Sequence, residues 1–140
     1  MKYLADADFV IDYFRNVRTA QALMPTLLTD GLALTNLCLI ELYDGVLGNP
    51  DPIQARAELR LFLRGVTIHP ITQKVILKTA ELRWTLRQSK APIQHRAYDL
   101  VGAATALVSG LILVSSNTRD YQDITGLRQL DPRTGQLMTH

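Results

Sequence analysis

The stretch "AYDLVGAATALVSGLILVSSNTRD" (residues 97–120) decides which fold class we predict for this chain. Its first part is rich in small and apolar residues and ends at Gly110, as is typical of a buried helix and its stop signal. Its second part, "LILVSS", has apolar side chains on both faces, as a central strand of a parallel sheet requires. The uncharged run at 100–118 is therefore interpreted as a helix and a buried strand, in preference to a membrane span.

Strands and helices alternate along the rest of the chain. Further strands are expected at 3–7, 32–36 and 66–71, and helices at 9–14, 20–28, 37–48, 52–65 and 74–88. The pattern from Tyr121 to His140 is weak, with one edge strand expected near Leu130. The alternation predicts an α/β fold with a central, mainly parallel sheet and helices on both faces. We expect one domain over 1–140, with a peripheral tail from about residue 131.

Composition restricts the function only weakly. Apolar residues make up 47% of the chain and charged residues 20%, an ordinary globular mixture, and the net charge of +2 indicates no particular partner. The single cysteine, Cys38, excludes an internal disulfide and fits a reducing cytosol. Asp6, Asp8 and Asp12 interrupt the N-terminal apolar run, so we expect no signal peptide and a cytoplasmic protein.

Polar side chains stand where the expected strands end. The positions are Asp6 after the first strand, Glu41 in the helix after the second, Asp99 at the start of the small-residue helix, and Asn117 and Asp120 after the last buried strand. Because ligands bind beyond the carboxyl ends of parallel strands, we expect these side chains to share one crevice. Crowded carboxylates repel one another, and oxygen ligands without His or Cys favour Mg²⁺ or Mn²⁺. Such a site suits hydrolysis of a phosphodiester bond.

Simpler interpretations exist for several of these residues. Asp6 or Asp8 could cap the first helix, and Asp99 could be a favourable charge at a helix N-terminus. Asp12 is interpreted as a solvated helix residue, and Trp84, among leucines, as part of the core. A receiver domain is a competing enzyme class, but the strand at 66–71 carries no acid and the late strand is not followed by lysine.

Three segments resemble PIN-domain ribonucleases of the VapC toxin type. They are "LADADFVIDYFR" (4–15), "LTNLCLIELYDGV" (34–46) and "AYDLVGAATALVSGLILVSSNTRDYQDITGL" (97–127). The resemblance implies a three-layer α/β/α sandwich, endoribonuclease activity with Mg²⁺ or Mn²⁺, a cognate antitoxin and a homodimer. It places the family's metal-binding acids on Asp6, Glu41 and Asp99, and the fourth catalytic position on Asn117, with Asp120 close by.

The segments also depart from the family pattern. Ala7 stands where the family usually has Thr or Ser, and Asn117 replaces a fourth acid. The alternative to an active ribonuclease is therefore a catalytically weak PIN-fold protein that binds RNA or a partner.

Three basic residues are candidates for binding RNA, because an acidic pocket needs flanking cations. They are Arg15, Arg96 and Arg119, each close in sequence to a proposed metal ligand. For the antitoxin, we expect an Arg or Lys near the acids and apolar side chains packed on the helices that carry Tyr13, Phe14 and Leu42.

Overall fold

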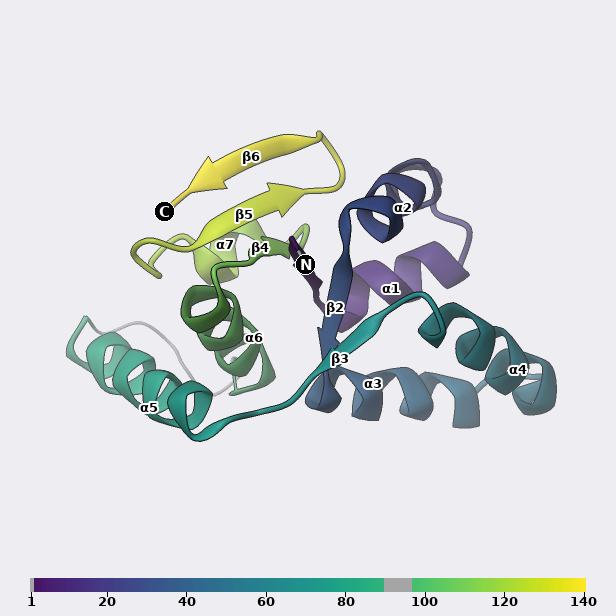
Figure 1. Cartoon of the computed structure of the whole chain (residues 1–140), viewed down its shortest axis with the longest axis horizontal. Coiled ribbons are helices and arrows are strands. Elements are labelled where there is room, and N and C mark those ends of the chain that lie inside the picture. The colour runs from purple at the N-terminus through teal and green to yellow at the C-terminus, as the bar shows by residue number, and fades with distance from the viewer. Residues whose placement is uncertain (1, 90–96) are drawn as a thin grey trace.

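The computed structural model describes residues 2–89 and 97–140, which contain one six-stranded sheet (Figure 1). The strand order is β3-β2-β1-β4-β5-β6, and all neighbours are parallel except β5 and β6. The strands are β1 (Tyr3–Ala5), β2 (Leu32–Thr35), β3 (Thr67–His69), β4 (Ile112–Val114), β5 (Arg128–Asp131) and β6 (Gln136–Thr139). The mainly parallel sheet is as predicted.

Helices cover both faces of the sheet. They are α1 (Ala7–Phe14), α2 (Arg18–Asp30), α3 (Asn36–Leu47), α4 (Pro52–Leu63), α5 (Gln73–Gln88), α6 (Ala97–Ser109) and α7 (Thr118–Tyr121). Figure 1 shows α1 to α4 on one side of the sheet and α5, α6 and α7 on the other. Along β1, Tyr3 and Ala5 pack into the core with α1 to α4, whereas Leu4 packs into the core with α5 to α7. This alternation follows from the two-residue period of a strand and confirms the three-layer sandwich.

Side-chain caps on the following helices set the ends of β1 and β2. The prediction ran β1 to residue 7, but the strand stops at Ala5 because the Asp6 side chain caps α1. Likewise β2 stops at Thr35, whose side-chain oxygen accepts from the Cys38 backbone N–H at 3.1 Å and caps α3. Each helix therefore begins immediately beyond its strand.

The uncharged run at 100–118 contains most of α6 and the whole of β4, as the sequence predicted. Within the described ranges, no helix combines the length and apolar character needed to cross a bilayer.

Two expectations were wrong. The strand expected near Leu130 is present as β5, but it lies inside the sheet and not at its edge: β6 is added as the edge through a turn in which Gly135 has φ of +74°. The sequence pattern was weak because β6 is short and mostly exposed. Trp84 is not in the core: it is 63% exposed on α5, which buries Val75 and Leu86 instead.

Candidate active site

Four acidic side chains line one small pocket at the carboxyl end of β1. They are Asp6, Asp8, Glu41 and Asp99, and they come from the junction of β1 and α1, from α1 itself, from α3 and from α6. Asp6, Glu41 and Asp99, which the sequence assigned to one crevice, are thus brought together. Asp8 also belongs to the pocket lining, although the sequence treated it only as a helix cap.

Asp6 both caps α1 and faces the pocket. Its backbone N–H donates to the carbonyl of Val114 at 3.2 Å, which extends the β1–β4 pairing by one bond. Its Oδ1 accepts from the Phe9 backbone N–H at 2.9 Å, and the Ser115 side chain also hydrogen-bonds to the carboxyl group. The capping interpretation is therefore correct for Asp6, and it coexists with a place in the site.

The acids share an unfavourable electrostatic environment. Burial raises the pKa of Asp6 to about 7, the hydrogen bonds from Ser115 and Phe9 oppose this rise, and the charges of Asp8 and Asp99 add to it. Burial also raises the pKa of Glu41, with further contributions from Asp8 and Asp99. Like charges at this edge of the sheet therefore disfavour the ionised forms of Asp6 and Glu41. A cation in the pocket would reverse that effect.

Two further polar groups in the pocket wall were not assigned to the site from the sequence. Burial, with the charges of Asp6, Glu41 and Asp8, raises the pKa of the Cys38 thiol to about 12, so the thiol stays protonated and unreactive. Tyr121 is 1% exposed, and its hydroxyl hydrogen-bonds to Asp99. Burial raises the pKa of Tyr121 well above its usual value. Its only signal in the sequence is its place directly after Asp120.

Asn117 and Asp120 lie beside the site but do not line the pocket. Asn117 precedes α7, and its backbone N–H donates to the Ser115 hydroxyl oxygen at 3.1 Å. Asp120 lies in α7, where its charge adds to the upward shift of the Tyr121 pKa. The sequence correctly placed both residues after the strand end, but their roles in catalysis remain predictions.

The basic candidates are separated. Arg15 lines a different hollow, together with Phe14 and Leu42, and Arg119 is exposed on α7. Arg96 lies outside the described residues.

The donor set of the pocket fits a hard divalent cation. Within residues 2–89 and 97–140, no three His, Cys, Asp or Glu side chains lie close enough together to bind one metal ion. That spacing is compatible with Mg²⁺, which commonly takes one or two carboxylates and keeps several waters. The available carboxylate oxygens and the protonated thiol favour Mg²⁺ or Mn²⁺ over Zn²⁺.

Comparisons with known proteins agree with this architecture. The model of the PIN domain family matches residues 3–127. A chain in the structure of VapBC2 from Rickettsia felis bound to promoter DNA has 23% identity and a TM-score of 0.80, with 94% of this chain and 100% of that chain covered. A chain in DNA-bound VapBC from Salmonella typhimurium has 22% identity and a TM-score of 0.84, covering 94% and 98%.

A third similar chain comes from a toxin-antitoxin complex from Klebsiella pneumoniae, with 23% identity, a TM-score of 0.71, and coverage of 94% and 98%. At these identities the solved structures show the fold alone. The comparison with curated proteins found no match.

Proposed function

This chain belongs to the PIN domain family, and we propose that it is the toxin of a toxin–antitoxin pair and cleaves RNA with Mg²⁺ or Mn²⁺. The observation that carries the proposal is the placement of Asp6, Glu41 and Asp99 around one pocket, each from a different element. One or two of these carboxylates would bind the ion directly, as is common for Mg²⁺, and the remaining acid would lie beside it. When bound, the ion would supply activation of water and stabilisation of the charge that develops on the phosphate.

The chain's own residues would orient the site. The N–H of Phe9 and the Ser115 side chain hold the Asp6 carboxylate, and the Tyr121 hydroxyl holds Asp99. Hydrogen bonds of this kind fix ligand orientation before the substrate arrives. Arg119 is exposed on α7 near the strand ends, and we expect it to contact an RNA phosphate.

RNA cleavage with matched variants tests the activity. Asp6→Asn, Glu41→Gln and Asp99→Asn should each abolish cleavage in Mg²⁺ or Mn²⁺, and EDTA should abolish cleavage by the wild type. Asp44→Asn is the control, because Asp44 lies three residues after Glu41 on α3, is exposed and does not line the pocket. Cleavage at the wild-type rate by any of the three site variants would remove that residue from the site.

The alternative, a catalytically weak protein that binds RNA or a partner, rests on Ala7 and Asn117. Ala7 lines the pocket but brings no side-chain oxygen to it, and Asn117 replaces a fourth acid. The same assay distinguishes the two functions: the alternative would show binding of RNA without metal-dependent cleavage. Sequencing the ends of RNA from cells that express the chain would then identify the substrate.

For the antitoxin, two adjoining hollows beside α1 provide the apolar surface that the sequence analysis expected. One is lined by Phe14, Leu42 and Val46, among others, and the other by Tyr13, Phe14 and Phe62, among others. The rings of Tyr13, Phe14 and Phe62 lie 5.3–5.7 Å apart between centroids, so they form a stiff aromatic wall. An antitoxin segment packed here would bring an Arg or Lys toward the acids. Its dissociation constant should rise with Mg²⁺ and in Glu41→Gln.

We also propose that the protein forms a homodimer in the cytoplasm, where Cys38 would stay reduced. Large apolar side chains are exposed on α5, namely Ile76 at 52%, Leu77 at 60% and Trp84 at 63%, and such a surface favours a covering partner. Light scattering should give the mass of two chains, and Trp84→Lys with Leu77→Lys should give the mass of one. A wild-type protein with the mass of one chain at all concentrations would contradict this.

A further inference from the structure

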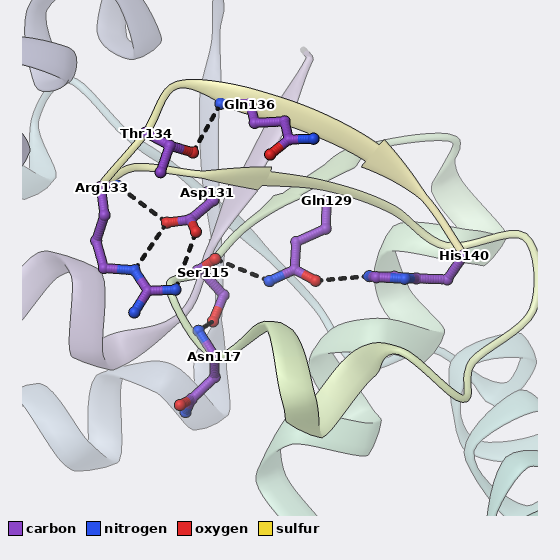
Figure 2. Close-up of polar contacts among 8 residues, drawn as sticks. All are labelled: Ser115, Asn117, Gln129, Asp131, Arg133, Thr134, Gln136 and His140. Carbon is purple, nitrogen blue, oxygen red and sulfur yellow. Dashed lines mark hydrogen bonds and ion pairs between the residues drawn. The ribbon is translucent and has the colours of Figure 1, made fainter.

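Ser115 joins the candidate metal site to the C-terminal β5–β6 hairpin, and Figure 2 shows its contacts with Asn117 and with the hairpin. It follows β4 and is fully buried, with 0% of its surface exposed. Its hydroxyl oxygen accepts from the Asn117 backbone N–H at 3.1 Å, and its side chain hydrogen-bonds to the Asp6 carboxyl group. Since one serine contacts both segments, its position sets the geometry of Asp6 relative to Asn117.

The sheet alone does not satisfy the Ser115 peptide. The register pairs Val114 with Leu130, and the Ser115 N–H donates to the Leu130 carbonyl at 3.2 Å. In a continued parallel ladder, the Ser115 carbonyl would accept from the N–H of residue 132. Residue 132 is Pro132, which has no N–H, so the ladder must stop there. A buried carbonyl at this place needs another donor.

Gln129 supplies that donor. Its side chain is fully buried, and its Nε2 donates to the Ser115 carbonyl at 2.8 Å. Because the amide nitrogen faces the carbonyl, the amide oxygen is the group that faces His140. The distance from His140 Nε2 to Gln129 Oε1 is 2.8 Å, so the ring nitrogen donates and the amide oxygen accepts. Figure 2 shows this line of contacts running from Ser115 through Gln129 to His140.

The hairpin backbone holds the His140 end of the line. The His140 N–H donates to the Leu127 carbonyl at 2.9 Å, and the Gly126 N–H donates to the His140 carbonyl at 2.8 Å. These two hydrogen bonds therefore hold the main chain that carries the imidazole. The imidazole in turn sets the orientation of the Gln129 amide. Gln129 donates a hydrogen bond that a leucine of similar size at this position could not donate.

We propose that Gln129 and His140 are positioning residues for the pocket, acting through Ser115 on the Asp6 carboxylate. This rests on the proposed function, in that the pocket must bind a divalent ion. Without the amide donor, the buried Ser115 carbonyl would have no hydrogen-bond partner. The peptide at Ser115 would then rotate until its carbonyl meets another donor. The serine hydroxyl would then leave its place between Asp6 and Asn117.

Mn²⁺ binding followed by calorimetry tests the proposal directly. Removal of partners behind metal ligands typically lowers affinity by about 10–100-fold, so Ser115→Ala and Gln129→Leu should fall near the lower part of this range. His140→Leu should weaken binding less, by no more than about tenfold, because Gln129 keeps its bond to the Ser115 carbonyl. His140→Gln should restore most of the affinity, since its amide can donate where the ring nitrogen did.

Thr134→Ala is the control for these variants. Thr134→Ala in the same hairpin removes an exposed hydroxyl that accepts from the Gln136 N–H at 3.2 Å, and its Mn²⁺ affinity should equal that of the wild type. If Gln129→Leu does not fold, the His140 pair of variants decides the outcome. Folded His140→Leu that binds Mn²⁺ as tightly as the wild type overturns the positioning role while leaving the proposed function intact. A wild type that binds no Mn²⁺ overturns both.

RNA cleavage gives a second readout. A change in the geometry of the metal site should lower kcat and leave KM almost unchanged, because the surface that binds RNA is not altered. A change confined to KM in His140→Leu would assign His140 to substrate binding and overturn the positioning role.

Discussion

Replacing Asp6 by Asn should stabilise the metal-free protein at pH 8, and this gain should shrink as the pH falls. The pKa of Asp6 rises from 3.8 to about 7, chiefly through burial. An amide has the shape of the carboxyl group but carries no charge, and Asn is as good a helix cap as Asp. The bond from the Phe9 N–H to the side chain at position 6 should therefore persist.

The size of the effect follows from the pKa difference. A shift of about three units corresponds to about 4 kcal/mol at about 1.4 kcal/mol per unit. The folded state holds the Asp6 proton more tightly than the unfolded state does. The protonated carboxyl group therefore contributes its full stabilisation of the fold below about pH 4, and this contribution is lost as the pH rises through about 7. Relaxation and partial solvent contact reduce the figure, so we expect Asp6→Asn to gain about 1–3 kcal/mol at pH 8 and less than half of that at pH 5.

Urea unfolding in EDTA at pH 5 and pH 8 measures the gain. Asp51→Asn is the matched control, because Asp51 caps α4 by accepting from the Gln54 N–H at 3.2 Å but is exposed and outside the pocket. Its stability should change by no more than about 0.5 kcal/mol at either pH. Added Mg²⁺ should stabilise the wild type but not Asp6→Asn. A loss of stability at pH 8, or an equal gain at both pH values, would refute the reasoning.

Three further predictions concern the residues around the pocket. Tyr121→Phe keeps the buried ring but removes the hydroxyl on Asp99, so Mn²⁺ affinity measured by calorimetry should fall by about tenfold, and an unchanged affinity would exclude this role. If Asn117 fills the fourth position, Asn117→Asp should bind the ion more tightly, and Asp120→Asn should cost less affinity than Asp99→Asn; tighter binding by Asp120→Asn would count against the scheme. Arg119→Ala should weaken binding across RNA sequences and lower the salt slope by about one, whereas an unaltered slope would remove Arg119 from the RNA surface.

The parts of the fold that sequence analysis predicted are those that depend on local pattern. The continuous apolar character of 111–114 marks a strand buried on both faces, and β4 lies between β1 and β5 as that pattern requires. The grouping of Asp6, Glu41 and Asp99 followed from a rule about parallel strand ends, and the structure brings all three to one pocket. Both predictions could therefore be made without knowledge of the tertiary contacts.

The parts that were missed depend on packing or register between distant segments. Trp84 sits in a helix with apolar residues at many positions, and only packing against α6 decides which of them are buried. The role of Gln129 follows from the pairing of β4 with β5, which sets Ser115 opposite the segment that contains Pro132. Likewise, the contact of Tyr121 with Asp99 joins α7 to α6, and the position of Tyr121 after Asp120 in the sequence does not reveal which side chain it contacts.

The ionised carboxylates of Asp6 and Glu41 oppose folding, and this connects the proposed metal to the proposed antitoxin. A native domain is stable by about 5–15 kcal/mol, so an Asp6 penalty of a few kcal/mol is a substantial share of the total. The hydrogen bonds from Phe9 and Ser115 offset part of the penalty, and a bound cation would remove more of it. An antitoxin arginine placed at the same carboxylates would relieve the same repulsion as a bound Mg²⁺ would. Each of the two cations would therefore stabilise the fold, while each would exclude the other from the pocket.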